Sequence, residues 1–107
     1  MKIRLVSLAP GTPRVRTIIN KLPAALGRNP DADVRLDDSW VSRIHCEISE
    51  ISGNLLVRDL GSTNGTLVNG KQVNESHLLP GDFLTVGLTI FRVQYKRNRK
   101  TSLATIC

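Results

Sequence analysis

Short stretches in which apolar and polar residues alternate dominate the chain. At the start, Ile3 and Leu5 lie on either side of Arg4, and similar stretches recur up to Tyr95. A period of two puts successive side chains on opposite faces, which is typical of β-strands that bury one face. The pattern predicts strands at residues 2–8, 14–19, 24–27, 34–36, 44–51, 55–59, 66–68, 77–79, 83–86 and 89–95.

Turn-forming residues separate these predicted strands at close intervals. They include the segment 10–13, Asn29-Pro30, Ser52-Gly53-Asn54, Asn64-Gly65, Asn69-Gly70 and Pro80-Gly81-Asp82. No stretch shows convincing helical periodicity, and many short strands joined by regular turns are typical of sandwiches and barrels. We therefore predict an all-β fold, an antiparallel β-sandwich of two twisted sheets with about ten to eleven short strands.

The length and the pattern together indicate one domain. A chain of 107 residues can enclose a single core without disulfides or metals. Aromatic residues make up only 4% of the sequence, so the core must come mainly from Leu, Ile and Val. The alternation stops at Lys96, and neither a repeat nor a linker precedes that residue. We predict a folded domain at residues 1–95, followed by a disordered basic tail at residues 96–107.

The formal net charge of +6 raises the question of a nucleic-acid partner. Four of these charges belong to the tail residues Lys96, Arg97, Arg99 and Lys100, which leaves only +2 for the rest of the chain. That remainder also lacks aromatic residues interleaved with basic ones for stacking on bases. A basic tail can touch phosphates weakly, but we expect no specific nucleic-acid partner.

Other features favour a cytoplasmic protein. No apolar run approaches the roughly 18 residues that cross a bilayer, so we expect no membrane partner. The apolar start of the chain is interrupted by Arg4 and is followed by no typical secretory cleavage site. The two cysteines, Cys46 and Cys107, are far apart and lack metal-ligand spacing. We expect Ile44, Cys46 and Ile48 to share the buried face of one strand.

Three polar clusters lie in predicted loops and are richer than turns require. They are Gly27-Arg28, the segment 41–45 with Ser42, Arg43 and His45, and the segment 59–66 with Ser62, Thr63 and Asn64. Together they offer two guanidiniums, several hydroxyls and a carboxamide, and Asp59 is the only acidic residue among them. Arginine suits a bidentate grip on phosphate, while hydroxyls and amides add neutral donors. The clusters therefore predict a site for an anion.

These clusters, in this order and spacing, resemble the forkhead-associated (FHA) domain family over about residues 1–95. The family pattern is a Gly-Arg pair, then Ser-x-x-His, then Asn-Gly, and this chain has Gly27-Arg28, Ser42 to His45 and Asn64-Gly65. The intervening features match as well: Asn29-Pro30 with the segment 33–36, and the segment 59–66 with a later Asn69-Gly70. Each dipeptide alone carries no weight, but the ordered set within a β-rich chain of this length is a specific signal.

The resemblance implies a function and assigns the site residues. FHA domains bind phosphothreonine on partner proteins through loops at one end of a β-sandwich. By this resemblance, Arg28 would hold the phosphate, the Ser42 hydroxyl would donate to a phosphate oxygen, and Arg43 would also reach the phosphate. Asn64 would bond the partner's backbone beside the phosphothreonine, and Thr63 would either donate to the ligand or brace the loop. We therefore predict a phosphopeptide-binding adaptor whose ligand is made by a Ser/Thr kinase.

The same resemblance implies supporting roles for three further residues. Gly27 would let the backbone pass closely, His45 would tie the Ser42 loop in place, and Gly65 would supply the positive φ of its turn. The resemblance also implies a small apolar recess between the Ser42 and Asn64 loops, which would receive the γ-methyl group of the phosphothreonine.

A catalytic interpretation fits the sequence poorly. Ser42 and His45 could form a nucleophile and a base, but no orienting acid or oxyanion hole is signalled. Asp59 is better interpreted as a loop brace. No Gly-rich nucleotide loop, metal-ligand set or carboxylate pair appears in the sequence. We therefore predict no enzymatic activity, no cofactor and no metal site.

Two questions stay open at this level. Trp40, just before Ser42, could pack under the loop or flank the bound peptide. The domain could also act as a phosphate-independent interaction or oligomerisation module of the same fold. All the phosphate-contacting positions carry competent residues, which favours phosphothreonine binding over this alternative.

Overall fold

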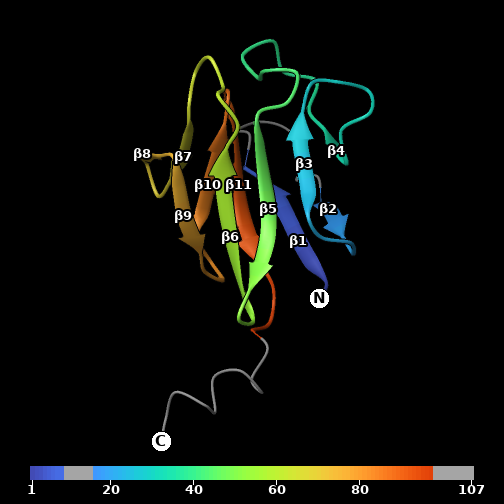
Figure 1. The fold of residues 1–107 in the computed structure, drawn as a ribbon, viewed down its shortest axis with the longest axis vertical. Coiled ribbons are helices and arrows are strands. Elements are labelled where there is room, and N and C mark those ends of the chain that lie inside the picture. The colour runs from blue at the N-terminus through green and yellow to red at the C-terminus, as the bar shows by residue number, and fades with distance from the viewer. Residues whose placement is uncertain (9–15, 98–107) are drawn as a thin grey trace, which may run out of the picture.

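The computed structural model describes residues 1–8 and 16–97. Within these ranges the chain forms strands and no helix, arranged in two layers (Figure 1). The strands are β1 (Ile3–Ser7), β2 (Arg16–Ile19), β3 (Ala24–Gly27), β4 (Val34–Arg35), β5 (Cys46–Ile51), β6 (Asn54–Asp59), β7 (Thr66–Val68), β8 (Lys71–Val73), β9 (Glu75–Leu78), β10 (Phe83–Val86) and β11 (Thr89–Gln94). The predicted all-β sandwich with about ten to eleven strands is confirmed.

The strands form two sheets that differ in size. One has six strands in the order β2-β1-β11-β10-β7-β8, and the other has five in the order β4-β3-β5-β6-β9. Every pair of neighbours is antiparallel except β3 and β4, which run in parallel. The β3–β4 pair is thus a local exception at one edge of an otherwise antiparallel sandwich. The loop after β3 turns the chain back, so Val34 and Arg35 pair with Leu26 and Gly27 in the same direction.

The core lies between the two sheets and is built mainly from branched aliphatic side chains. In β6, Leu55 and Val57 are buried whereas Arg58 is exposed, as the alternation predicts. Members of this core from both sheets include Ile3, Leu5, Leu26, Ile48, Leu55, Val57, Leu78, Leu84, Val86, Phe91 and Val93. Among the described residues, the apolar positions of the alternating pattern thus specify which face of each strand is covered.

Cys46 is a core residue, as predicted, but Ile44 does not share its face. Cys46 and Ile48 are fully buried, whereas Ile44 is 42% exposed and precedes the strand. Desolvation by burial raises the pKa of the Cys46 thiol to about 12, so the thiol stays protonated near neutral pH. The prediction for Ile44 failed because β5 begins at Cys46, after an irregular segment that carries polar side chains.

The sequence pattern also missed one strand and misplaced another. β8 is formed by the exposed Lys71 and Gln72 with Val73, which show no hydrophobic alternation. The Asn69-Gly70 turn creates this strand, because φ is positive at both turn residues and the hairpin pairs with β7. β9 ends at Leu78 instead of Leu79.

Several expectations lie outside the described residues. They concern the predicted turn at 10–13, the start of the second predicted strand at residues 14 and 15, and most of the basic tail, residues 98–107. No helix among the described residues is long and apolar enough to span a membrane.

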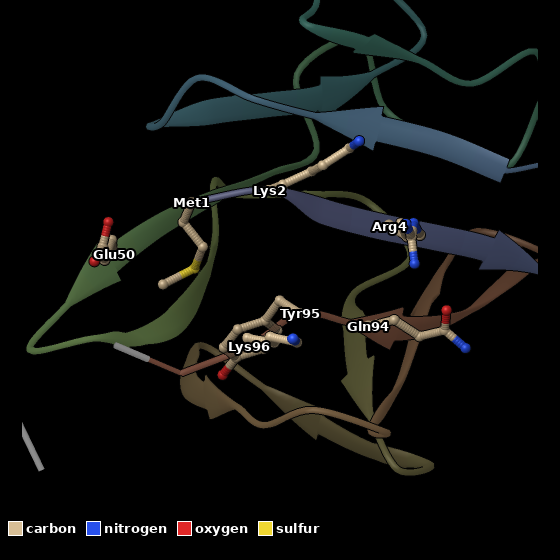
Figure 2. Close-up of a pocket in the computed structure, with 7 residues that line it drawn as sticks. All are labelled: Met1, Lys2, Arg4, Glu50, Gln94, Tyr95 and Lys96. Carbon is tan, nitrogen blue, oxygen red and sulfur yellow. The ribbon is translucent and has the colours of Figure 1, made fainter. Parts of the chain in front are cut away.

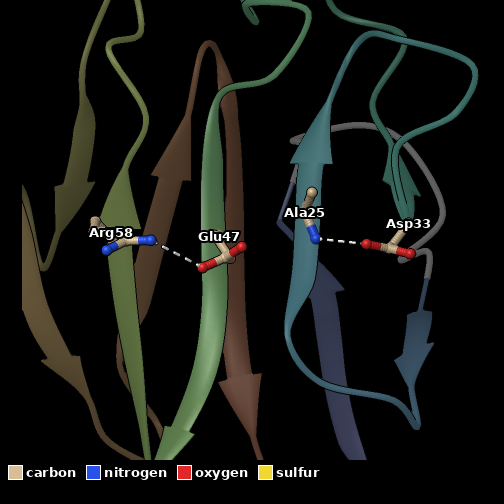
Figure 3. A network of polar contacts seen from close by, with 4 residues as sticks. All are labelled: Ala25, Asp33, Glu47 and Arg58. Carbon is tan, nitrogen blue, oxygen red and sulfur yellow. Dashed lines mark hydrogen bonds and ion pairs between the residues drawn. The ribbon is translucent and has the colours of Figure 1, made fainter.

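Polar contacts strengthen the outer side of the five-stranded sheet (Figure 3). Arg58 and Glu47, on the adjacent strands β6 and β5, form an ion pair with an N–O distance of 3.3 Å. Near the sheet edge, the Asp33 carboxylate accepts a hydrogen bond from the Ala25 amide at 2.8 Å. This second contact fixes the loop that leads from β3 into β4.

Three loops meet at one end of the sandwich, the upper end in Figure 1. They are the segment after β3, the segment between β4 and β5, and the segment between β6 and β7. The Arg28 amide donates to the Ser42 carbonyl at 3.0 Å, and the Thr63 amide donates to the Ser42 hydroxyl oxygen at 3.0 Å. These bonds join all three loops, and the loops carry the polar clusters found in the sequence.

Candidate functional site

Gly27, the last residue of β3, allows an unusually close approach of two backbones. A Cβ atom at this position would lie 2.0 Å from the Arg43 carbonyl oxygen, far inside van der Waals contact. The absence of a side chain lets the chain after β3 pair with the segment at Ser42 and Arg43. The amides of Arg28 and Asn29 then donate to the carbonyls of Ser42 and Arg43. This pairing brings the two predicted site arginines to neighbouring chain segments.

The Arg28 side chain is anchored at one nitrogen. Its Nε donates a hydrogen bond to the Val41 carbonyl at 3.0 Å, although the residue as a whole is exposed. Among the described residues, its two terminal nitrogens have no hydrogen-bond partner. A guanidinium held at Nε presents its two terminal N–H groups as a fork, which matches two oxygens of a phosphate.

Ser42 links the first two loops to the third. Its Oγ accepts a hydrogen bond from the Thr63 amide, and its own amide donates to Nδ1 of His45 at 3.0 Å. Because Oγ acts as an acceptor toward Thr63, its hydroxyl proton remains available for an external acceptor. The half-buried Ser42 can therefore donate to an anion placed beside Arg28.

His45 is fully buried and bridges two loops through its ring. Its Nδ1 accepts from the Ser42 amide, and its Nε2 lies 2.8 Å from the Gly65 carbonyl oxygen. Since an amide can only donate and a carbonyl can only accept, the ring must be the neutral tautomer that carries hydrogen on Nε2. The imidazole thus connects the Ser42 loop to the β6–β7 loop.

The β6–β7 loop is organised around Asp59. Its carboxylate accepts hydrogen bonds from the amides of Gly61 and Ser62 and from the hydroxyls of Ser62 and Thr66. The Ser62 hydroxyl oxygen accepts in turn from the Gly65 amide at 2.9 Å, and Gly65 has a φ of +86°. Only glycine adopts that conformation without strain, so this turn depends on Gly65.

The hydrogen bonds to the Asp59 carboxylate make the free energy of unfolding depend on pH. Burial raises the pKa of Asp59, but hydrogen bonds from Ser62, Thr66 and Gly61 outweigh this effect, and the pKa lies below its ordinary value of 3.8. The unfolded chain therefore binds a proton at higher pH than the folded chain does. The stabilisation that Asp59 contributes is complete at pH values above the pKa of the unfolded chain, about 3.8. It is lost as the pH falls below 3.8 and passes through the lower pKa of Asp59 in the folded protein.

We expect the free energy of unfolding in urea to fall when the pH is lowered from 5.5 to 3. The Asp59→Asn variant should be less stable at pH 5.5 but should show a shallower decrease toward pH 3, since it lacks the titrating group. Equal slopes in the two proteins would mean that Asp59 contributes nothing to this dependence.

Asn64 and Trp40 connect the same loops on the outside. The Asn64 Nδ2 donates to the Trp40 carbonyl at 2.8 Å, and the amide oxygen of this exposed residue has no hydrogen-bond partner among the described residues. Trp40 is 52% exposed, so about half of it remains accessible to a ligand at this end of the sandwich. Its backbone carbonyl is the atom that contacts Asn64.

Arg43 lies beside a hollow that sequence reasoning did not anticipate. The hollow has a volume of about 390 Å³ and is lined by Arg28, Asn29, Pro30, Arg35, Asp37 and Arg43. Arg35 was not predicted as a site residue, although its position two residues after Asp33 belongs to a matched segment. Its place in the hollow follows from its pairing with Gly27, and this pairing exists only once the parallel edge strand has formed.

Asp38 is a second residue that sequence reasoning missed. Its carboxylate accepts hydrogen bonds from the amides of Trp40 and Leu88 and from the Thr89 hydroxyl, at 2.8–2.9 Å. Burial raises the pKa of Asp38, yet these bonds lower it below the ordinary value overall. Asp38 therefore ties the loop before Ser42 to the β10–β11 hairpin of the other sheet, fifty residues away along the chain.

The gathered groups are donors suited to an anion. Guanidiniums, a hydroxyl and amides converge, while the carboxylate of Asp59 in the β6–β7 loop is already occupied by four hydrogen bonds. Nothing in residues 1–8 and 16–97 forms a cluster of His, Cys, Asp and Glu able to hold a metal. The arrangement can bind a phosphate through charge-assisted hydrogen bonds.

A larger hollow of about 630 Å³ lies elsewhere and contains none of the predicted site residues (Figure 2). It is lined by Met1, Lys2, Arg4, Glu50, Gln94, Tyr95 and Lys96. Its basic side chains come with the carboxylate of Glu50 and the apolar surface of Met1 and Tyr95. It does not combine guanidiniums with anchored hydroxyl and amide donors, as the loop end does.

Comparison with known proteins gives matches in sequence and in structure. The FHA domain model matches residues 25–87, more than half of the chain. The chain is 40% identical over 72 residues to the glycogen accumulation regulator GarA of Mycolicibacterium smegmatis, covering 67% of this chain and 46% of that protein. It is 42% identical over 72 residues to the oxoglutarate dehydrogenase inhibitor of Corynebacterium jeikeium, covering 67% and 50%. The chain thus spans about half the length of these curated relatives.

The fold agrees with these matches. A solved structure from a structural and functional analysis of phosphothreonine-dependent FHA domain interactions aligns over 92% of this chain and 100% of its own. The TM-score is 0.77 and the sequence identity is 32%. The family match, the identity to the two relatives and the shared sandwich show that this chain belongs to the FHA domain family.

Proposed function

We propose that this domain is a non-catalytic adaptor that binds a phosphothreonine-bearing segment of a partner protein. The phosphate would lie at the loop end, held by the terminal nitrogens of Arg28, the Ser42 hydroxyl and the Arg43 guanidinium. Asn64 would bond the ligand backbone through its amide oxygen, which can accept from a ligand amide. Thr63 would brace the loop through its amide and present its hydroxyl to the ligand.

One observation carries this proposal. The close approach at Gly27 places Arg28 and Ser42 side by side, with Arg28 anchored at Nε and the Ser42 oxygen already used as an acceptor. Both groups are therefore oriented with unused donors before any ligand arrives. Such preorganisation reduces the entropy that binding must overcome. The solved FHA structure described above comes from a study of phosphothreonine-dependent interactions, which supports the same ligand for this chain.

Calorimetry with a matched peptide set tests the proposal. A library that is degenerate around a fixed phosphothreonine identifies a favoured sequence, which is then made with phosphothreonine, threonine or glutamate at the central position. The phosphopeptide should bind, and the threonine peptide should not bind measurably. The glutamate peptide should bind at least about tenfold more weakly, because a carboxylate has one charge and two oxygens instead of almost two charges and three oxygens.

The same experiment addresses the alternative of a phosphate-independent interaction module. Such a module would bind the threonine and glutamate peptides as tightly as the phosphopeptide, or would bind none of them. Either result would contradict the proposed function. The unengaged arginine donors at the loop end favour phosphate binding over this alternative, since nothing in a phosphate-independent contact requires them.

We also expect the site to prefer phosphothreonine to phosphoserine. The γ-methyl group would enter the recess that the family resemblance implies between the Ser42 and Asn64 loops. Burying one methyl group contributes about 0.8 kcal/mol, which is roughly fourfold in affinity. The β-branched side chain is also stiffer at χ1, so less rotamer freedom is lost on binding. The preference should therefore exceed fourfold in a titration of two otherwise identical peptides, and equal affinities would exclude the recess.

The biological setting follows from the ligand. A phosphothreonine requires a Ser/Thr kinase, so we propose that a kinase controls this interaction. The relatives are a regulator of glycogen accumulation and an inhibitor of oxoglutarate dehydrogenase, which is consistent with a regulatory partner protein. We further propose a cytoplasmic location, where ATP-dependent kinases act and where a free thiol such as that of Cys46 stays reduced.

A further inference from the structure

We propose that the outer face of the six-stranded sheet is a second docking surface, which binds a partner-protein segment that combines acidic and apolar side chains. This face consists of the side chains that point away from the core in the strands of that sheet. It contains none of the residues proposed to contact the phosphothreonine, all of which lie in the loops at one end of the sandwich.

The strand registers arrange this face in three rows of paired residues. The rows are Ile18, Arg4 and Gln94; Arg16, Val6, Arg92 and Phe83; and Ile90, Thr85 and Leu67. Because successive residues of a strand point to opposite sides, the buried neighbours of these residues face the core and the rows face outward. The Arg92 guanidinium lies over the Phe83 ring, 5.9 Å from its centroid, so these two neighbours share one side of the sheet. Apolar and cationic side chains are thus interspersed across the face.

The apolar members of the rows remain accessible to a partner. Ile18, Phe83 and Ile90 are each 41–43% exposed, and they lie in three different rows. Within residues 1–8 and 16–97 the two sheets are the only layers, so no further element covers this side of the sandwich. Covering these side chains with a partner would remove apolar area from water, which favours association.

The charges on this face have one sign. Arg4, Arg16 and Arg92 belong to the rows, and none of the six strands, all of which the structure describes, contains Asp or Glu. The strands of the five-stranded sheet instead carry Glu47, Glu50, Asp59 and Glu75. There, Glu47 pairs with Arg58, the one ion pair found in the described ranges. With no carboxylate in their own sheet, the three arginines favour a ligand that brings its own carboxylates.

This combination favours a protein segment over other occupants. A second copy of the chain would bring like-charged guanidiniums together without carboxylates to pair with them. An anionic membrane needs apolar side chains that reach beyond the charged ones, but arginine is longer than the isoleucine and phenylalanine side chains beside it. Single-stranded nucleic acid stacks on successive aromatic rings, and Phe83 is the one aromatic residue in the rows. A segment in which Asp or Glu alternates with apolar residues satisfies both features of the face.

Size and position connect this face to the phosphate-binding loops. Six strands about 4.8 Å apart and about four residues long cover roughly 400 Å², whereas a stable interface buries about 800 Å² on each partner. The β10–β11 hairpin, which leads into Ile90, is tied to the loop before Ser42 because Asp38 accepts from the amides of Trp40 and Leu88. The face therefore starts near the end of the sandwich where the loops meet (Figure 1). It adds affinity for a partner that is already held by its phosphothreonine, and this step rests on the proposed function.

Extended phosphopeptides test the surface. The favoured phosphothreonine peptide is joined, at one end and then at the other, to an eight-residue segment through a six-residue Gly/Ser linker that spans about 14 Å. The segments alternate Ile with Glu, Ile with Ser, Ser with Glu, or Ile with Lys. In the wild-type protein, the Ile–Glu segment should raise the affinity about fivefold or more from at least one end, and the gain should shrink at high salt. The other three segments should change the affinity less than about twofold.

Two charge reversals locate the contact. In Arg92→Glu, at the centre of the face, the gain from the Ile–Glu segment should fall below about twofold, and the Ile–Lys peptide should bind at least as tightly. In Arg58→Glu, on the other sheet, the wild-type pattern should persist. Both variants should bind the unextended phosphopeptide as the wild type does, which shows that the loops are intact. An Ile–Glu gain that survives in Arg92→Glu, equal gains from all segments, or no gain from either end would overturn the proposal.

A second measurement does not depend on phosphothreonine recognition. The isolated Ile–Glu segment is titrated into the wild type and into Arg28→Ala while NMR follows the backbone amides. Saturable shifts of the β1, β10 and β11 amides in both proteins support the surface. If these shifts occur although no phosphothreonine peptide binds the wild type, the surface stands and the proposed function is refuted.

Other results of the NMR experiment exclude the proposed occupant. Shifts confined to the loops or to the five-stranded sheet refute the surface. Anionic lipid vesicles and a single-stranded oligothymidine are titrated in parallel. If either perturbs the β1, β10 and β11 amides while the Ile–Glu segment does not, the face binds a membrane or a nucleic acid and the proposal of a protein segment is refuted.

Discussion

The Arg28→Ala variant should bind a phosphothreonine peptide roughly a hundredfold more weakly than the wild type. Hydrogen bonds to charged groups contribute about 1.5–3 kcal/mol each, and a forked guanidinium can make two of them to one phosphate. A loss of about 3 kcal/mol corresponds to this decrease in affinity. Calorimetry with the favoured phosphopeptide measures it directly.

The fold of Arg28→Ala should be almost unaffected. Arg28 is exposed, and among the described residues its side chain makes one hydrogen bond, from Nε to the Val41 carbonyl; the backbone bond of its amide is kept in the alanine variant. We therefore expect a melting temperature close to that of the wild type. The Arg58→Ala variant is the matched control, because it loses an exposed, ion-paired guanidinium on the face of the sheet and should bind normally. An Arg28→Ala protein within threefold of the wild-type affinity would remove Arg28 from the phosphate site.

The His45→Ala variant should be destabilised by about 2–5 kcal/mol. Two partners of the ring, the Ser42 amide and the Gly65 carbonyl, would be left without a hydrogen bond, at about 1–3 kcal/mol each, and a cavity would remain in a fully buried position. For a domain of this size, the melting temperature should fall by roughly 10 °C or more. Binding should weaken as well, because the Ser42 loop and the β6–β7 loop lose their shared support.

Two variants sharpen the test of His45. His77→Ala removes an exposed imidazole from the edge strand β9 and should change stability by less than about 0.5 kcal/mol. His45→Gln retains one donor and one acceptor on its side chain and should recover part of the lost stability. A His45→Ala protein with an unchanged melting temperature but no phosphopeptide binding would show that His45 contacts the ligand instead of supporting the loops.

Local chemistry explains why the sequence predicted the fold class. Strand positions such as Leu55 and Val57 alternate with polar neighbours, and this period of two is independent of what lies across the sheet. Where a strand lacks the pattern, prediction failed. β8 consists of two exposed residues and the half-buried Val73, and it exists because the Asn69-Gly70 turn folds it onto β7. The parallel pairing of β4 was also beyond reach, since two residues carry no information about direction.

For the site, too, one part could be predicted from the sequence and another part depends on the tertiary structure. By itself, the sequence determined the inventory of donors, because residue types such as Arg28, Ser42 and Asn64 define which ligand chemistry is possible. Tertiary structure alone decided how these donors are used. It pairs Gly27 with Arg35, encloses the hollow between Arg35 and Arg43, and brings Asp38 to a hairpin fifty residues away. Such contacts join residues that are remote in the chain, so they depend on the packing of two sheets and not on any local period.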